Sequence, residues 1–452
     1  MIKQYLTHLS TFIHNLKFDQ IDAKTTHHAK VIFADCIAAM IGGQAEQEML
    51  ALTPRFAQNQ SPNATIIGTT LQARAMDAAF LNGSSGTFLE MDEGNQFARG
   101  HPGMHVLPAL LALAEQKKIS GEAFITAFVI AYEVAARLGI ATHLRHSMHP
   151  HGTWGVVGGV AGLTKLKKYD AETIKRGINI ASSLSLATSR KTMLEGGTVR
   201  NVYTGVSNQM AHLALDLLDS GFDGEHDGLS SVFGHVVSEQ FDPSAMINGL
   251  GETWEMDRNY FKLHACCRFN HAALDALMHI INIDGDQIDV NNISQIDVST
   301  YNLAAELNDP KPRNSLAARF SIPFAMATTL INGTSDISSF SGDALIHPAT
   351  LNLASCVHVN ENPAMSAMLP DKRPAQVQIT LSDGRRFSHE VETNRGDWQD
   401  PYSQEELQVK YLSLCERRWH SDHALEIYKD IMKIETASSL NGLMKKMRLA
   451  SA

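Results

Sequence analysis

The sequence predicts a mainly α-helical fold, in which both ends of the chain form one large all-helical domain and a smaller α+β domain is inserted between them. Three observations support this prediction. The chain has 452 residues, more than the roughly 250–300 residues at which a single core stops growing. Helix start and stop signals succeed one another up to about residue 265, and strand signals follow only after it. We therefore expect residues 1–265 and 400–452 to form the helical domain and residues 266–399 to form the α+β domain.

The first part of the chain carries clear helix signals. Lys30–Met40 has apolar residues on most faces, as a buried helix has. Pro108 favours the first position of a helix that runs from Ala109 to Gln116, because the N–H that proline lacks is unpaired there anyway. Ser120 is a typical N-cap for the next helix, over Glu122–Leu138, and Gly139 is its expected stop.

Two more helices are expected before residue 265. Asp170 and Glu172 open one of them with an acidic first turn. Tyr203–Leu218 forms the other, which ends at Gly221. Between them, Ala181–Ser189 is dense in alanine and serine, and such small residues permit close helix packing.

Strand patterns mark the inserted domain. Residues 293–300 alternate with a period of two, so that Ile296 and Val298 share one face. A second and a third alternating run, 377–381 and 387–391, flank Asp383-Gly384, which is a strong hairpin signal.

The chain returns to helix after the hairpin. Ser403 and Glu406 form a capping box for a helix that reaches Arg418. Beyond His423 no strand signal occurs, so this end of the chain is assigned to the helical domain.

The composition excludes several functional classes. A net charge of −10 argues against a nucleic-acid partner, because phosphate binding needs a basic face. Five irregularly spaced cysteines predict free thiols and a cytoplasmic location. The N-terminal segment lacks the continuous apolar core of a signal peptide. The apolar run Val31–Ile41 is too short to span a bilayer, so no membrane partner is expected.

The segment from Phe88 to Pro108 concentrates groups that move protons. Its carboxylates, arginine and histidines are Glu90, Asp92, Glu93, Arg99, His101 and His105. Glycines and prolines predict that most of it is loop. A histidine oriented by a carboxylate is a natural general base near neutral pH. The alternative is a solvated polar loop with one histidine that caps the next helix.

Two further segments follow in the helical part. His149 begins His-Pro-His-Gly-Thr, and glycines follow it, but no strand precedes them and their spacing does not fit a phosphate-binding loop. His149 is either a site residue or a core histidine. Arg200 and Tyr203 are three residues apart at a helix start and can share a face. An arginine there can bind a carboxylate with paired hydrogen bonds, although a surface position is the more usual fate of arginine.

A last basic cluster lies at the predicted domain junction. It contains Lys262, Arg268 and His271. Clefts between domains are favoured ligand sites, and a partly desolvated lysine there can donate or accept a proton. The alternative is a solvated hinge.

Together these segments resemble the MmgE/PrpD family, which includes 2-methylcitrate dehydratase, cis-aconitate decarboxylase and iminodisuccinate epimerase. The resemblance covers nearly the whole chain. It rests on Glu90-Met-Asp92-Glu93, His101-Pro-Gly, Val106-Leu-Pro-Ala-Leu-Leu-Ala-Leu-Ala-Glu115, His149-Pro-His-Gly-Thr153, Arg200 to Gly205, Lys262 with Cys266-Cys-Arg268 and His271, Ala318-Arg-Phe-Ser-Ile-Pro-Phe324, and Asp400-Pro-Tyr-Ser-Gln-Glu-Glu406.

The resemblance implies a helical domain with an α+β lid, a homodimer, and a site without metal or cofactor at the domain junction. It points to Asp92 or Glu90, His101, His149, the position of Arg200, and Lys262 as site residues. The sequence departs from the family at Arg200 and Tyr203, where members with dehydratase or decarboxylase activity tend to carry lysine and histidine. The stretch Gly94–Arg99 also differs. These departures concern the substrate and not the fold.

We therefore expect a cofactor-independent lyase that dehydrates or decarboxylates a small polycarboxylate by proton transfer next to a carboxylate. In this hypothesis His101 takes or delivers the proton, and the carboxylate of Glu90 or Asp92 orients the His101 ring. Lys262 is the partner acid or holds a substrate carboxylate. The remaining candidates, namely His149, Arg200, Arg99, Tyr203, Arg268 and His271, would bind the substrate.

Three alternatives stay open at this point. The first is an epimerase that acts on an iminodisuccinate-like dicarboxylate. The second is a metallohydrolase that uses His101 and His105, which Pro102 and Gly103 disfavour because they break the helix that would align the two rings. The third is a ligand-binding relative without catalytic activity.

Overall fold

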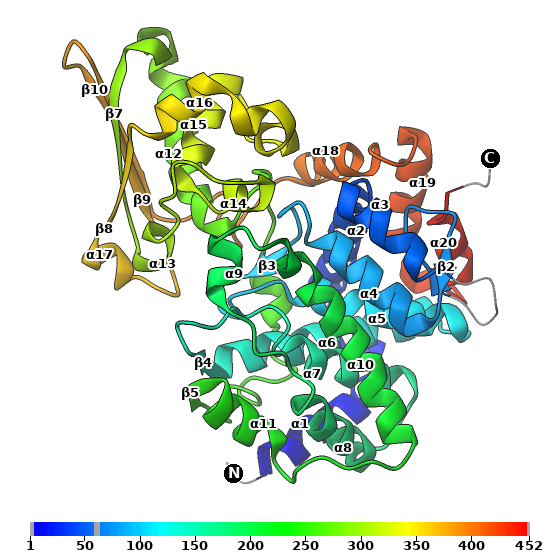
Figure 1. Cartoon of the computed structure of the whole chain (residues 1–452). Coiled ribbons are helices and arrows are strands. Elements are labelled where there is room, and N and C mark those ends of the chain that lie inside the picture. The colour runs from blue at the N-terminus through cyan, green and yellow to red at the C-terminus, as the bar shows by residue number, and fades with distance from the viewer. Residues whose placement is uncertain (1–3, 58–63, 450–452) are drawn as a thin grey trace.

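The computed structural model describes residues 4–57 and 64–449. The chain is mostly helical with a few short strands, which confirms the mainly α class (Figure 1). The longer helices before residue 265 are α1 (Tyr5–Asn15), α2 (Ala23–Gln44), α4 (Ala75–Gly86), α5 (Pro102–Gln116), α6 (Gly121–Ala141), α7 (Gly155–Leu166), α8 (Ala171–Ser182) and α10 (Tyr203–Asp219).

The C-terminal helices lie against the N-terminal ones. They are α18 (Gln404–Cys415), α19 (Ser421–Ile431) and α20 (Asn441–Lys446). Helices α18 and α19 pack on α2, and α20 packs on α5. Figure 1 shows these orange and red helices beside the blue α2 and α3 (Gln47–Leu52). The two ends of the chain thus share one packed region, while the exact boundaries at residues 265 and 400 stay a prediction.

The predicted helix starts at Ser120, Asp170 and Ser403 are present, because each depends on a local hydrogen bond. The side chain of Ser120 accepts the Ala123 N–H at 3.3 Å, and Asp170 accepts the Thr173 N–H at 2.8 Å. Ser403 and Glu406 form the expected capping box of α18. That helix ends at Cys415, three residues earlier than predicted.

The prediction for Pro108 was wrong, since α5 begins at Pro102 and contains Pro108 in its interior. Proline lacks the N–H that would bond the carbonyl four residues earlier. Asn208 of α10 replaces the lost bonds. Its Nδ2 donates to the Met104 carbonyl at 3.0 Å, and its Oδ1 accepts the Ala109 N–H at 2.9 Å.

Two further local predictions were wrong. Gly139 does not end α6, which continues to Ala141. A Cβ at Gly139 would lie 2.7 Å from the Ala98 carbonyl oxygen, so the glycine serves close packing instead. Most of Ala181–Ser189 is loop, because α8 ends at Ser182.

A four-stranded sheet carries the second fold element. Its strands are β7 (Ile293–Thr300), β8 (Val357–Glu361), β9 (Ala375–Leu381) and β10 (Arg386–Val391), in the order β10-β9-β7-β8. Strand β7 and the β9–β10 hairpin were predicted. Strand β8, which pairs in parallel with β7, was not, because its sequence Val-His-Val-Asn-Glu offers only two apolar residues.

Helices cover one face of the sheet (Figure 1). Helix α12 (Arg268–Asp284) packs on β9 and β10. Helix α15 (Ile322–Asn332) packs in turn on α12 and on α16 (Pro348–Ala354). Helix α12 begins within the basic cluster at the predicted junction, with Arg268 and His271 in its first turn, so this cluster lies where the sheet-bearing part leaves the helical part.

Helix α6 is long and apolar enough to cross a membrane, by its length and composition alone. In this structure 89% of its most apolar window is buried inside the protein. It packs on α5 and α7 and forms part of the core.

Candidate active site

The loop between α4 and α5 carries the first group of candidate residues. Glu90 and Arg99 in this loop have φ angles of +55° and +59°. Residues other than glycine rarely adopt such angles, and those that do concentrate at functional sites. The short strand β3 (Gly94–Asn95) pairs with β6 (Asn259–Tyr260), which places Lys262 beside the loop.

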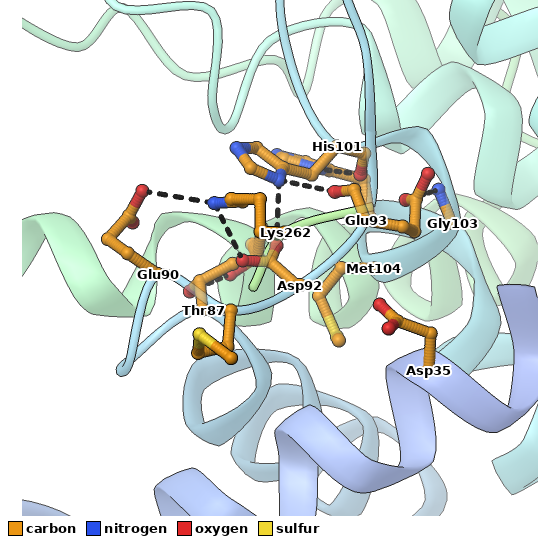
Figure 2. Close-up of polar contacts among 12 residues, drawn as sticks. Asp35, Thr87, Glu90, Asp92, Glu93, His101, Gly103, Met104 and Lys262 are labelled. Carbon is orange, nitrogen blue, oxygen red and sulfur yellow. Dashed lines mark hydrogen bonds and ion pairs between the residues drawn. The ribbon is translucent and has the colours of Figure 1, made fainter. Parts of the chain in front are cut away.

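Five side chains form a line of alternating charge, in the order Arg200, Glu90, Lys262, Asp92 and His101. Arg200 forms an ion pair with Glu90. The Lys262 Nζ lies 3.4 Å from Glu90 Oε2 and 3.7 Å from Asp92 Oδ1. The other oxygen of Asp92 lies 2.9 Å from His101 Nδ1. Figure 2 shows how Lys262 bridges the two carboxylates on one side of the His101 ring.

The opposite charges in this line keep its buried groups ionised. Burial alone would raise the pKa of both carboxyls, but Arg200 and Lys262 lower that of Glu90, and His101 and Lys262 lower that of Asp92. Burial alone would lower the pKa of Lys262, and Glu90 and Asp92 raise it well above the usual value. Lys262 therefore holds its proton firmly at neutral pH.

The hydrogen bonds of His101 determine which of its nitrogens can accept a proton. Its Nδ1 donates to the Glu93 carbonyl at 2.5 Å. Nε2 has no hydrogen-bond partner within residues 4–57 and 64–449. In the neutral ring Nε2 therefore presents a lone pair, as a general base requires.

His149 has the opposite tautomer. Its Nδ1 accepts the His151 backbone N–H at 3.0 Å, so the proton of the neutral ring is on Nε2. Burial and the positive charge of Arg200 hold its pKa well below the usual value. His149 is thus a neutral hydrogen-bond donor. The ring of Tyr203 lies behind it at 6.1 Å between centroids.

Two other buried groups support the loop. Burial and the charge of Asp92 raise the pKa of Glu93 to about 8, so this carboxyl is neutral near pH 7. Its Oε1 accepts the Gly103 N–H at 2.8 Å, at the start of α5. Both ring nitrogens of His105 are hydrogen-bonded inside the protein. Its Nδ1 donates to the His101 carbonyl, and its Nε2 accepts the Gly152 N–H.

The basic cluster at the junction forms a second buried ion pair. Nη2 of Arg268 lies 2.5 Å from Asp397 Oδ1, and Nη1 donates to His271 Nδ1 at 3.0 Å. His271 Nε2 donates to the Cys266 carbonyl at 3.2 Å. His271 therefore orients Arg268 from behind. It is not one of the residues that line the cavity described next.

A cavity of about 410 Å³ brings most of the candidates together. The predicted residues that line it are Glu90, Arg99, His101, His149, Arg200 and Arg268. Asp92 and Lys262 are completely buried behind this wall. Tyr203 and His271 are not among its lining residues.

Several lining residues were missed by the sequence reasoning. They are His151, Arg145, Arg190, Arg373 and Tyr301. His151 had a signal, because it shares the His-Pro-His segment with His149, and its ring lies 4.7 Å from that of His101. Arg373 and Tyr301 had none, since they reach the cavity from segments about 200 or more residues away from His101 along the chain.

The cavity wall also contains a cysteine, Cys267. Burial and the charge of Glu90 raise the pKa of its thiol to about 11, so it is no thiolate near pH 7. Among the residues that the structure describes, no group of three or more histidine, cysteine or carboxylate side chains is placed to hold a metal ion.

Comparisons with known proteins identify the family and its relatives. The MmgE/PrpD N-terminal domain matches residues 7–244, and the MmgE/PrpD C-terminal domain matches residues 264–433. The human cis-aconitate decarboxylase is 25% identical over 98% of this chain and 95% of its own length. The cis-aconitate decarboxylase of Aspergillus terreus is 23% identical over 95% of this chain and 93% of its own length. A cis-aconitate decarboxylase-like protein of Aspergillus oryzae is 23% identical over 96% and 95%.

Proposed function

The chain belongs to the MmgE/PrpD family, and we propose that it is a cofactor-independent lyase that transfers a proton next to a carboxylate of a small polycarboxylic acid. The relatives named above support a lyase, since they span more than nine-tenths of this chain and are decarboxylases by name. A cis-aconitate-like tricarboxylate is the first substrate to test.

The observation that carries this proposal is the charge of the cavity around His101. Six arginines line the cavity, but only one carboxylate does, Glu90, which is already paired with Arg200 and Lys262. Such a wall attracts a polyanion. It also stabilises the negative charge that develops when a carbon next to a carboxylate loses a proton or carbon dioxide.

The proposed decarboxylation proceeds in two steps. The bond between the leaving carboxylate and the substrate carbon breaks, carbon dioxide departs, and the electron pair stays on the carbon skeleton. The protonated His101 then delivers a proton from Nε2 to the carbon. In the related dehydration, His101 Nε2 first takes the proton from the carbon next to the carboxylate. The electron pair left there forms the carbon–carbon double bond, and the β-hydroxyl leaves as water after it gains a proton from the same His101 Nε2.

The surrounding groups stabilise the charged His101 ring and position the substrate. Asp92 stabilises the charged ring of His101 from the Nδ1 side. His149 donates from Nε2 to a substrate oxygen. Lys262 neutralises the negative charges of Glu90 and Asp92 from behind the cavity wall. We therefore assign it an electrostatic role without substrate contact.

Proton NMR in heavy water tests the proposal. The protein is incubated separately with cis-aconitate, 2-methylcitrate and freshly prepared iminodisuccinate. A decarboxylated or olefinic product that carries deuterium next to a carboxylate is the expected result. Folded protein that produces neither a new compound nor deuterium exchange would contradict the proposal.

An epimerase of an iminodisuccinate-like dicarboxylate is the second candidate. The observation that favours it is that two histidines line the same cavity with complementary tautomers, an acceptor at His101 and a donor at His149. An epimerase needs one group to remove the proton and another to return it. Interconversion of enantiomers without a change in mass distinguishes it from the lyase.

We also propose that the protein is a cytoplasmic homodimer. The five cysteines are all free thiols, which suits a reducing compartment. Sedimentation equilibrium at micromolar concentration tests the dimer.

A further inference from the structure

The six arginines of the cavity wall fall into two groups. Four have a carboxylate partner, in the pairs Arg145–Glu239, Arg190–Glu306, Arg200–Glu90 and Arg268–Asp397. Arg99 and Arg373 have no carboxylate partner within residues 4–57 and 64–449. The lack matters most for Arg373, which is only 5% exposed, because a buried charge without a counterion is costly.

These two arginines meet at one backbone group. The carbonyl of Gln96 accepts a hydrogen bond from Arg373 Nη2 at 3.0 Å and from the Arg99 backbone N–H at 3.3 Å. The positive φ of Arg99 belongs to the same turn. Partial desolvation at the cavity wall lowers the pKa of Arg99, although its side chain keeps an exposed part, and the charge of Arg373 lowers it further, as expected for two guanidinium groups close together without an anion between them.

A third donor lies in the same part of the cavity. The hydroxyl of Tyr301 is buried and has no hydrogen-bond partner among the described residues. Its ring packs edge-on against Phe269 at 5.8 Å, and the guanidinium of Arg373 lies 5.4 Å from the centre of that same Phe269 ring. An unpaired buried donor is rare in folded proteins and calls for a ligand or an ordered solvent partner.

We propose that Arg99, Arg373 and Tyr301 form a subsite for a second carboxylate of the substrate, distinct from the one next to the reacting carbon. The identity of the bound group as part of a substrate rests on the proposed function. A carboxylate is the ligand that fits, because it accepts paired hydrogen bonds from guanidinium groups and one from the phenol.

The subsite also joins the two parts of the fold. Arg99 belongs to the loop before α5, whereas Arg373 and Tyr301 flank strands β9 and β7 of the sheet. A distal carboxylate bound there holds the sheet-bearing part against the catalytic loop. Acids with a single carboxylate cannot make this connection, so the subsite selects dicarboxylates and tricarboxylates.

Binding of unreactive acids tests the subsite without turnover. Isothermal titration calorimetry compares tricarballylate, succinate and butyrate on the full-length protein. We expect Arg373→Gln and Arg99→Gln each to weaken tricarballylate binding about 10- to 100-fold, and to change butyrate binding less than about threefold. Arg99→Gln guards against misfolding, because the Arg99 side chain is exposed and makes no hydrogen bond to the described residues.

Arg176→Gln is the matched control, since Arg176 is not among the residues that line the cavity and is paired with Asp223. It should bind tricarballylate within about threefold of the parent. Tyr301→Phe should have a smaller effect than either arginine variant. The subsite is overturned if the parent fails to bind tricarballylate at millimolar concentration, if both arginine variants bind it normally, or if they weaken butyrate equally.

The same variants separate this inference from the proposed function. Charge-dependent binding without turnover of any acid would sustain the subsite and refute the lyase. Turnover with unchanged KM in both Arg99→Gln and Arg373→Gln would sustain the lyase and refute the subsite.

Discussion

His101 and His149 differ in chemistry because different backbone groups hold their rings. The Glu93 carbonyl accepts a hydrogen bond from Nδ1 of His101, while the His151 N–H donates one to Nδ1 of His149. Each ring is thereby fixed in one tautomer before any ligand arrives. A substrate between them meets an acceptor at one histidine and a donor at the other.

His101→Asn should lower kcat by about 100- to 10,000-fold, the usual contribution of a general acid or base. The measurement is the initial rate with whichever acid the NMR experiment identifies, together with the melting temperature. His143→Asn is the control, because His143 lies at the rim of the same cavity with an exposed side chain. A loss of less than tenfold in a folded His101→Asn protein would refute the role of His101.

Glu93 gives the protein a specific pH dependence. Its pKa is raised from 4.5 to about 8, so the folded protein keeps a proton that the unfolded chain loses above about pH 4.5. The folded state then binds more protons than the unfolded state, and the free energy of unfolding falls as pH rises between these values. The slope from one group is at most about 1.4 kcal/mol per pH unit.

Glu93→Gln should remove this slope, because the amide stays neutral at every pH and still accepts the Gly103 N–H. Urea unfolding at several pH values between 5 and about 8.5 measures the difference between parent and variant. We expect the variant to gain stability relative to the parent as pH rises through this window. Parallel stability curves would contradict a neutral Glu93.

At the scale of one element, α5 shows how a distant side chain repairs a helix. Pro108 removes one hydrogen bond from the helix, and Asn208 of α10 supplies substitutes to Met104 and Ala109. Asn208→Ala leaves a buried carbonyl and a buried N–H unpaired, at about 1–3 kcal/mol each. It should therefore lower the free energy of unfolding by roughly 2–4 kcal/mol, less any recovery by internal water.

A double-mutant cycle checks this account. In the Pro108→Ala background the residue at 108 regains its N–H and can bond the Met104 carbonyl itself. Asn208→Ala should then cost clearly less than in the parent, with a coupling of at least about 0.5 kcal/mol. Gln209→Ala, next to Asn208 but directed at Asp77, should show no such coupling. Equal costs in both backgrounds would rule out the repair.

The same helices show what the sequence can predict. Ser120 and Ser403 were predicted as caps, and Asp170 as the start of a helix, because their partners lie three residues away. Pro108 and Gly139 were misjudged because their partners come from distant segments. Proline inside a helix normally breaks it, and only the buried amide of Asn208, one hundred residues further on, makes it tolerable here.

At the scale of the whole molecule, the candidate site also combines residues that local sequence patterns predict with residues that they do not. Glu90, His101, His149 and Arg200 were predicted and do meet at one cavity. Arg373 was missed, because no local pattern reveals that the turn before β9 faces the loop before α5. The sequence also did not predict how deeply each residue is buried. Lys262 was expected to act on the substrate from a cleft at the domain junction, and it lies completely buried between two carboxylates.

Lys410 links three distant parts of the chain at the back of the site. From α18 its Nζ forms an ion pair with Asp35 of α2 and donates to the Met91 carbonyl at 2.6 Å. Met91 stands between Glu90 and Asp92, so the C-terminal segment anchors the catalytic loop directly. Lys410 is only 4% exposed, so little solvent competes with these two contacts in the parent protein.

Lys410→Met should act on stability and on activity by separate routes. It leaves Asp35 buried without its counterion, which should destabilise the protein by about 3–5 kcal/mol. It also frees the loop at Met91. Lys446→Met is the control, since Lys446 forms half-exposed ion pairs with Glu426 and Asp430 and should cost less than about 1 kcal/mol.

The double variant Lys410→Met with Asp35→Leu separates the two routes. It removes the orphaned carboxylate, and replacement of a buried ion pair by apolar residues is often nearly neutral for stability. The melting temperature should therefore return toward the parent value, whereas kcat should stay low because the Met91 carbonyl still lacks its donor. Recovery of both properties together would show that Lys410 serves only to neutralise Asp35, and that the catalytic loop holds its shape without the C-terminal helices.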